Sequence, residues 1–205
     1  MNSLLVTYIL QTEKWTSPEL FETKNRIYTF LNPVSYLIAL ENKSLFEQFD
    51  GIFADGSLLV SAIRLVYGKR VTRRSFDMTS LAPELLNYLM ESRKTLYIVA
   101  SGQEQVECSV RIFQEQYPKL RIAGFRNGYF SSDAEMNKEA SHIVELNPDF
   151  LIVGMGALMQ EKFLLKVKKM GYQGIGFTCG GFVHQTAMNR MHYYPDLIRL
   201  YEKLP

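Results

Sequence analysis

Short apolar runs alternate with longer amphipathic segments along most of the chain. The runs are rich in β-branched and aromatic residues, and LYIVA and FLIVG are apolar throughout, which is typical of strands buried on both faces. Six strands are predicted, at Arg26–Leu31, Gly51–Ala54, Thr95–Ala100, Arg121–Phe125, Asp149–Val153 and Gly174–Thr178. Continuous strands of this kind favour a parallel sheet.

The segments between these runs carry apolar residues at helical spacing. One predicted stripe is Leu59, Ala62, Ile63 and Val66, and another is Val106, Val110, Phe113 and Tyr117. Start and stop signals are Ser132 with Glu135, Thr79 and Ser80 with Pro83, and Gly171 after the basic end of Leu158–Met170. Strands alternating with helices predict an α/β fold, a Rossmann-like parallel sheet flanked by helices.

Composition and net charge restrict the class of protein and its partners. The 205 residues carry 23 Lys and Arg against 21 Asp and Glu, a net charge of +2, and 47% are hydrophobic. These values fit a packed globular chain and exclude a disordered one. No nucleic-acid partner is expected, because such partners normally require a strong basic excess. Any site that binds an anion must therefore depend on groups close to it and not on the net charge of the chain.

Cysteine usage and the N-terminus predict a cytoplasmic protein. Cys108 and Cys179 form no disulfide framework and predict two semi-buried thiols in a reducing compartment. The N-terminal segment has no basic region before its apolar patch, and no run approaches the roughly 18 apolar residues that a spanning helix needs. A protein of this kind can still lie on a membrane.

Glycines cluster after the predicted strands. The set is Gly102, Gly128, Gly154, Gly156, Gly180 and Gly181. Ligands of open α/β sheets bind at the carboxyl edge, where helix N-termini offer free N–H groups to anions. A single glycine is better explained by a tight turn. The set as a whole favours an anionic ligand such as a nucleotide diphosphate.

Several common site motifs are absent from the sequence. Gly154 and Gly156 begin a dinucleotide fingerprint, but Met159 stands where the third glycine is needed, and Thr178 ends the next strand where an acidic residue is needed. There is no phosphate-binding P-loop, no Asp-x-Asp pair, no zinc spacing and no hydrolase signature. A nucleotide site without a resident metal remains.

Four segments taken together resemble a known family. They are FLNPVSY (30–36), FADGSLL (53–59), SGQEQVE (101–107) with RNGYF (126–130), and GMGALMQEKF (154–163). In this order and spacing they are similar to the WecG/TagA/CpsF family, glycosyltransferase family 26. The resemblance runs from about residue 27 to 181, and the ADG and GxGxxxQEK pair is its most specific part.

The resemblance implies an activity and its partners. The family transfers a sugar, often of the N-acetylmannosamine type, from a UDP-sugar to a polyprenyl-diphosphate-linked saccharide, with inversion and without a cofactor or bound metal. It works in the cytoplasm at the inner face of the bacterial plasma membrane, as a peripheral protein, in surface-polysaccharide biosynthesis. It also implies a catalytic domain over residues 1–181, a short C-terminal appendage over 182–205, and self-association.

The resemblance also implies roles for particular residues. Asp55 matches the ADG aspartate and is the expected base that deprotonates the acceptor hydroxyl; the alternative is a cap for the helix that begins near Ser57. Gln160 is expected to hold sugar hydroxyls, with Glu161 an ordinary first-turn residue. Asn32 is a further sugar or acceptor contact, although Phe30 stands where the family has threonine, with Thr29 one place earlier.

The leaving diphosphate needs stabilising charge, which helix N-termini and arginines can supply. Arg73, Arg74 and Arg190 are the candidate arginines, with a solvated surface as the alternative for the first two. The expected nucleotide-binding residues are Ser101, Gly102, Asn127, Tyr129, Gly154, Gly156 and Gly180. Tyr129 can stack on the uracil or lie buried at a strand edge.

The C-terminal tail is predicted to form one further helix, and two other functions are considered beside the transferase. Leu197, Leu200, Tyr201 and Leu204 share one face of a predicted basic amphipathic helix over 195–204, which suits either a membrane surface or docking on protein. Two rival functions stay open. One is a nucleotide-sugar binding module without catalysis, and the other is a dinucleotide-dependent oxidoreductase.

Overall fold

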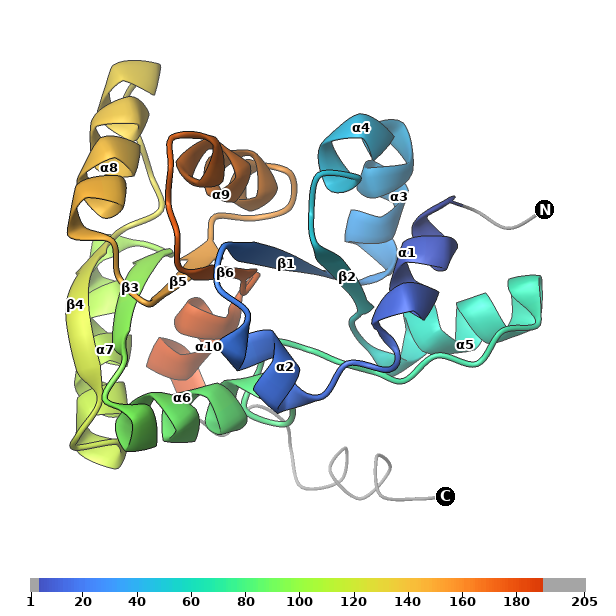
Figure 1. Cartoon of the computed structure of the whole chain (residues 1–205), viewed down its shortest axis with the longest axis horizontal. Coiled ribbons are helices and arrows are strands. Elements are labelled where there is room, and N and C mark those ends of the chain that lie inside the picture. Colours follow the sequence, from blue (N-terminus) through green and yellow to red (C-terminus); the bar gives the residue numbers. More distant parts are fainter. Residues whose placement is uncertain (1–3, 190–205) are drawn as a thin grey trace.

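The computed structural model describes residues 4–189. Within them, six parallel strands form one sheet in the order β2-β1-β6-β5-β3-β4 (Figure 1). In chain order the strands are β1 (Arg26–Leu31), β2 (Gly51–Ala54), β3 (Thr95–Ala100), β4 (Arg121–Arg126), β5 (Phe150–Gly154) and β6 (Ile175–Thr178). The predicted parallel sheet flanked by helices is confirmed.

Helices cover both faces of this sheet. They are α1 (Leu4–Thr12), α2 (Ser17–Glu22), α3 (Pro33–Glu41), α4 (Lys43–Phe46), α5 (Ser57–Tyr67), α6 (Leu81–Ser92), α7 (Gln103–Gln116), α8 (Asp133–Leu146), α9 (Met159–Lys169) and α10 (Phe182–Asn189). One hydrophobic core joins the sheet to α2, α6, α7 and α10, and the other joins it to α1, α3, α4, α5, α8 and α9. In Figure 1, α2, α6 and α10 lie below the sheet and α3, α4, α8 and α9 above it, whereas α1 and α5 lie at its β2 end.

The strand boundaries follow the apolar runs closely. β1, β2 and β3 have the predicted bounds, and the other three differ by one residue. Asp149 was predicted to begin a strand but precedes β5, because its carboxylate accepts hydrogen bonds from the backbone N–H and the hydroxyl of Thr95, both at 3.0 Å. This side-chain bridge ties the start of β5 to the start of β3.

The predicted stripe of α5 is wrong in its orientation. Leu59 and Ile63 are buried as expected, but Ala62 is exposed and Val66 is 69% exposed. The side of α5 that faces the core is rotated, relative to the predicted stripe, toward Val60 and Tyr67, which are partly buried and pack against the core. The exposed side instead carries apolar residues, including Leu65 at 87% exposure.

The last described helix belongs to the core. Phe182 stacks on Phe113 of α7 with ring centroids 5.5 Å apart, and the Ser109 hydroxyl donates to the Val183 carbonyl over 2.6 Å. Residues 182–189, the beginning of the predicted appendage, thus pack on the same body as the sheet. The predicted helix over 195–204 lies outside the described residues.

Candidate functional site

A cavity of about 890 Å³ opens along the carboxyl edge of the sheet. The segments that follow all six strands contribute lining residues, from Asn32 after β1 and Asp55 after β2 to Gly128 after β4 and Gly180 after β6. This edge is where parallel α/β sheets bind ligands, because the strands end there and the following helices begin.

Nine of the predicted site residues line this cavity. They are Asn32, Asp55, Ser101, Gly102, Tyr129, Gly154, Gly156, Gln160 and Gly180. Asn127, Arg73 and Arg74 are not among the lining residues, and Arg190 lies outside the described part of the chain. The fold therefore gathers at one edge residues that are far apart in sequence.

Asp55 follows β2 and is partly buried. One carboxylate oxygen, Oδ1, accepts a hydrogen bond from the Ser75 hydroxyl, and Oδ2 has no partner among the described residues. Burial raises the pKa of Asp55 and the nearby Asp77 carboxylate adds to this, while the Ser75 hydrogen bond and the charge of Arg73 oppose it. The oxygen Oδ2 is thus a proton acceptor of increased basicity, fixed through its partner oxygen.

The helix-capping alternative for Asp55 does not hold. The N-cap position of α5 is Gly56, and no side chain caps this end of the helix. The backbone N–H of Asp55 donates to the Leu31 carbonyl of β1 over 2.8 Å, which fixes the strand end. Its side chain remains available to the cavity.

Arg73 is held beside the cavity by Asp77. Its guanidinium donates to the Asp77 carboxylate over 2.9 Å and to the Thr79 hydroxyl over 3.1 Å. Asp77 lines the cavity, whereas no Lys or Arg among residues 4–189 does. The solvated-surface alternative for Arg73 is therefore also wrong, because a partly buried ion pair engages it.

Arg74 lies against the body of the protein. Its guanidinium donates to the Trp15 carbonyl over 2.8 Å and stands 5.1 Å from the centroid of the Phe53 ring. Its Nη1 is buried with no partner among the described residues. Arg74 thus joins the N-terminal segment to β2.

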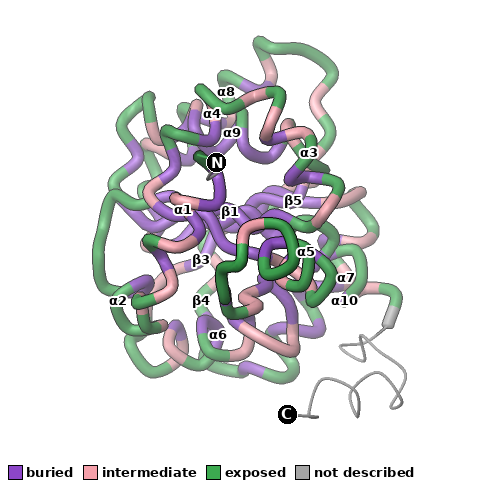
Figure 2. Tube along the Cα trace, turned by 90° about the vertical axis from the view of Figure 1, so that its right-hand side faces the viewer, coloured by how far each residue is buried: buried purple, intermediate pink, exposed green. Residues whose placement is uncertain are grey.

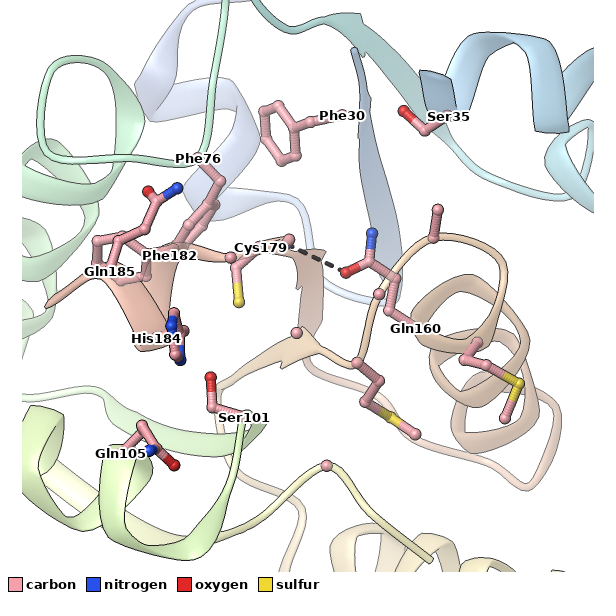
Figure 3. A pocket seen from close by; sticks show the side chains of 18 of the residues that line it. Phe30, Ser35, Phe76, Ser101, Gln105, Gln160, Cys179, Phe182, His184 and Gln185 are labelled. Carbon is pink, nitrogen blue, oxygen red and sulfur yellow. Dashed lines mark hydrogen bonds between the residues drawn. The ribbon is translucent and has the colours of Figure 1, made fainter. Parts of the chain in front are cut away.

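Gln160 is fixed by a buried hydrogen-bond network. Its Oε1 accepts from the Gly180 N–H over 3.1 Å, a contact drawn as a dashed line in Figure 3, and its Nε2 donates to Glu161 over 2.9 Å. One amide hydrogen and one lone pair remain for a ligand. The side chain is thus oriented at the cavity wall with limited freedom.

Glu161 is fully buried, so the expectation of an ordinary first-turn residue is wrong. It accepts from the Thr29 hydroxyl over 2.9 Å and the Leu158 N–H over 2.7 Å, and Thr178 in turn donates to Thr29. Burial raises the pKa of Glu161, against the hydrogen bonds that it accepts. Glu161 joins β1, β6 and the start of α9 behind Gln160.

Phe30 and Thr29 face opposite sides of β1. Successive strand residues face opposite sides, so Phe30 lines the cavity edge and Thr29 points to Glu161. Asn32 then caps α3, because its Oδ1 accepts from the Ser35 N–H over 2.9 Å. Asn32 lines the cavity, and its amide nitrogen has no partner among the described residues.

Tight backbone geometry shapes the centre of the cavity. A Cβ on Gly154 would lie 2.6 Å from the Gly180 carbonyl, so only glycine permits this approach of the two strand ends. Gly156 has a φ of +82°, in the region that favours glycine. Ser101 also has a positive φ, of 56°, and joins the loops through bonds to Gly154 and Gly128.

Helix N-termini face this part of the cavity. α7 begins after Gly102 with no side-chain cap, and α9 begins after Leu158, whose N–H is bound by Glu161. Free backbone N–H groups in a first turn and the helix dipole attract anions. The uncapped start of α7 is therefore a place that can attract an anion, in a cavity whose lining has no lysine or arginine from residues 4–189.

Tyr129 stands at the β4 side of the cavity and is 73% exposed, so the alternative of a buried strand-edge tyrosine is wrong. Asn127 supports it from behind: its Oδ1 accepts from the Tyr129 N–H over 2.9 Å, and its Nδ2 donates to Gln103 over 3.0 Å. Tyr129 therefore presents an accessible ring, and Asn127 positions the loop.

The cavity also contains residues that the sequence did not suggest. Gln105 and His184 are two of them, and they lie with the predicted Ser101 on one side of the cavity, opposite Gln160 (Figure 3). His184 lies three residues after Gly181, in the first turn of α10, so the same strand-end rule could have found it. Burial raises the pKa of the Cys179 thiol to about 12, which makes it an unreactive wall residue.

In residues 4–189, no three His, Cys, Asp or Glu side chains come together as a metal site would require. None of the helices in the same range has the length and apolar character needed to cross a bilayer.

Known proteins resemble this chain over most of its length. A family model described as the glycosyl transferase WecG/TagA/CpsF family matches residues 10–198. A Shigella boydii protein named UDP-Gal:alpha-D-GlcNAc-diphosphoundecaprenol beta-1,4-galactosyltransferase is 33% identical over 173 residues, 84% of this chain and 72% of the relative.

Two further relatives share a second name, N-acetylglucosaminyldiphosphoundecaprenol N-acetyl-beta-D-mannosaminyltransferase. The Bacillus subtilis protein is 23% identical over 185 residues, 88% of this chain and 69% of the relative. The protein of Staphylococcus aureus strain NCTC 8325 is 25% identical over 146 residues, 70% of this chain and 56% of the relative.

Proposed function

The chain belongs to the WecG/TagA/CpsF family of glycosyl transferases, and from this premise we propose that it moves a hexose from a UDP-sugar to a saccharide on a polyprenyl diphosphate. The names of the relatives specify acceptors of this class, N-acetylglucosamine on diphosphoundecaprenol. They differ in the sugar transferred, galactose in one and N-acetylmannosamine in the other. Family membership makes the chain an enzyme and counts against both the binding-module and the oxidoreductase alternatives.

The order of residues along the cavity carries this proposal. The predicted nucleotide residues follow β3, β4, β5 and β6, whereas Asn32 and Asp55 follow β1 and β2, at the other side of the sheet. Five strand spacings of about 4.8 Å separate β2 from β4, about 24 Å in all. A nucleotide diphosphate sugar is an elongated molecule, and this length accommodates it together with an acceptor.

The donor is proposed to lie along this edge with its uracil at Tyr129. Its diphosphate would lie at Gly154, Gly156 and the start of α9, and its sugar at Gln160. The support for this placement is the accessible ring of Tyr129, the close backbone approach at Gly154 and the partly unused hydrogen-bonding capacity of the Gln160 amide.

Asp55 is proposed as the base of an inverting displacement. Its Oδ2 would accept the proton of the acceptor hydroxyl as that oxygen bonds to the anomeric carbon and the UDP leaves with the electrons of the broken bond. The raised pKa makes the carboxylate a better proton acceptor, and the Ser75 hydroxyl holds its other oxygen in place. The leaving diphosphate would be stabilised by helix N-termini, and the reaction is proposed to need no metal.

The test is a titration followed by a transfer assay. UDP is titrated into the protein calorimetrically in chelator, with NAD as the control ligand; binding of UDP alone is expected. UDP-galactose and UDP-N-acetylmannosamine are then offered with N-acetylglucosamine on a short polyprenyl diphosphate, and the product anomer is read by NMR. Absence of UDP binding, a strict Mg²⁺ requirement or retention of configuration would each contradict the corresponding part of the proposal.

A further inference from the structure

An exposed apolar surface lies at the β2 end of the sheet. Within residues 4–189, twelve large hydrophobic residues are exposed, and five of them are on α3 and α5. They are Val34, Leu37, Leu58, Leu65 and Val66, with exposures from 62% to 87%. Figure 2 looks onto this end of the molecule, with α5 toward the viewer, and most residues of α5 are exposed. We refer to these five residues as the α3/α5 face.

The two helices share this end because of the strand order. β1 and β2 pair in parallel, and α3 and α5 begin directly after them. Leu58 and Leu65 are separated by seven residues, two turns of an α-helix, so they lie on the same side of α5. The opposite side of α5, with Leu59 and Ile63, is buried in the core. α5 thus carries apolar residues on its outer, exposed side as well as on the side that faces the core.

Basic residues border the α3/α5 face. Residues 57–74 contain five Lys and Arg and no Asp or Glu. Three of the five, Arg64, Lys69 and Arg70, are exposed and form no ion pair within residues 4–189. Glu13, a nearby carboxylate, is engaged with the Thr72 N–H over 2.8 Å.

We propose that the α3/α5 face lies on an anionic phospholipid bilayer. Apolar side chains that enter the headgroup region, bordered by cations that meet anionic lipid, are the features of an interfacial helix. A second copy of the chain is disfavoured as the occupant, because a two-fold interface places the same surface on both sides, so the basic border of Arg64, Lys69 and Arg70 would meet a second basic border. The negative lipid surface instead neutralises them.

This inference rests on the proposed function and adds a geometry to it. α5 begins at Ser57, two residues after Asp55, and Asn32 caps α3. A bilayer on the α3/α5 face therefore lies beside the end of the cavity that holds the proposed base. A diphosphate-linked acceptor anchored in that bilayer would present its saccharide to Asp55, while the nucleotide end of the cavity remains toward the β4 side of the sheet.

The first test is co-sedimentation of the full-length protein with vesicles, of phosphatidylcholine alone or with 30% phosphatidylglycerol. Binding to the anionic vesicles is expected, and it should weaken with salt because surface charges are screened. In Leu65→Gln/Val66→Gln and in Arg64→Gln/Lys69→Gln/Arg70→Gln, the partition coefficient should fall at least tenfold. Equal binding by wild type and both variants, or no binding by the wild type, would overturn the proposal.

Matched variants separate the other occupants. Leu146→Gln/Met170→Gln removes two exposed apolar residues at the ends of α8 and α9, away from the cavity edge, and should bind like wild type. If Leu200→Gln/Leu204→Gln alone abolishes binding, the tail and not the α3/α5 face holds the membrane. If ultracentrifugation shows a wild-type oligomer that the Leu65→Gln/Val66→Gln variant loses, the face is a contact between copies and the proposal fails.

A water-soluble, short-chain acceptor keeps this test distinct from that of the proposed function. The Leu65→Gln/Val66→Gln variant should transfer sugar to it within about twofold of wild type and lose transfer only to an acceptor embedded in vesicles. Equal loss on both acceptors would show damage to the cavity and overturn the bilayer assignment. If wild type binds vesicles through the α3/α5 face but transfers to neither acceptor, the proposed function fails and the surface assignment holds.

Discussion

Replacing Asp55 with asparagine separates the catalytic cost of the carboxylate from its effect on stability. Asparagine has nearly the same shape, and its carbonyl oxygen can still accept the Ser75 hydrogen bond. It cannot accept the proton of the acceptor hydroxyl. Loss of a general base lowers turnover by a factor of about 10²–10⁴, which corresponds to about 2.7–5.4 kcal/mol in the activation barrier. The affinity for UDP should stay nearly unchanged.

The same substitution should stabilise the fold at neutral pH. Burial and the Asp77 carboxylate raise the pKa of Asp55, so the folded protein holds this proton more tightly than the unfolded chain does. Wild-type stability therefore falls as the pH rises from the unfolded pKa, about 3.9, through the raised folded pKa. Below the unfolded pKa the two proteins should have the same free energy of unfolding, and above the folded pKa Asp55→Asn should be the more stable.

Asp149→Asn is the matched control. Burial also acts on Asp149, but hydrogen bonds from Thr95 and the cation of Lys94 hold its pKa below the usual range. This substitution should lower stability at neutral pH and leave transfer unchanged. The assays are urea unfolding from pH 3 to 8 and initial rates of transfer. Transfer by Asp55→Asn within a few-fold of wild type would refute the base assignment, and lower stability than wild type at pH 7 would refute the burial argument.

Three further substitutions test the cavity wall. Glu161→Ala leaves the Thr29 hydroxyl without its acceptor and should lower the free energy of unfolding by about 1–3 kcal/mol. It should lower kcat more than it lowers the affinity for UDP, and an unchanged kcat would refute the proposal that Glu161 positions Gln160. Gly154→Ala places a Cβ 2.6 Å from the Gly180 carbonyl, so it should lower the free energy of unfolding by about 1–3 kcal/mol. It should also lower the affinity for UDP measured by calorimetry. Wild-type values for both quantities would contradict the close approach. Tyr129→Ala should weaken UDP binding by about 1–3 kcal/mol, the range for base stacking on an aromatic ring, without a change in melting temperature. Tyr129→Phe keeps the ring and should bind UDP as wild type does. If both variants bind UDP with wild-type affinity, stacking on Tyr129 is excluded.

The fold was predictable because its signals are local. Continuous apolar runs mark buried parallel strands, and the carboxyl-edge rule then brings Asp55, Gln160 and the glycines together without any knowledge of distances. The orientation of α5 was predicted only in part: Leu59 and Ile63 face the core, but Ala62 and Val66 of the same stripe are exposed, and Leu58 and Leu65 make the outer side apolar as well. Periodicity identifies an apolar stripe but does not show which part of it faces the core.

The parts of the site that sequence reasoning missed depend on partners that the sequence pattern does not show. Glu161 accepts a hydrogen bond from Thr29, which lies 132 positions earlier in the chain. The solvated alternative for Arg73 was wrong because Asp77 forms an ion pair with it, and although Asp77 is only four residues on, neither residue lies in a helix whose periodicity would pair them. Such pairings follow from the fold, and no local pattern carries them.

The charge distribution of the cavity gives the donor a direction. Asp55 and Asp77 lie at the β2 side, and Arg73 pairs with Asp77, so Asp55 is, among residues 4–189, the carboxylate without an ion-pair partner at this end. This end therefore suits a neutral sugar and the acceptor hydroxyl better than a diphosphate. The uncapped start of α7 lies toward β3 and acts as roughly half a positive charge, whereas the Glu161 carboxylate already caps the start of α9. A UDP-sugar placed the other way round would set its phosphates against Asp55 and away from α7. The electrostatics and the order of the strands therefore favour the same orientation, with the anomeric carbon beside Asp55.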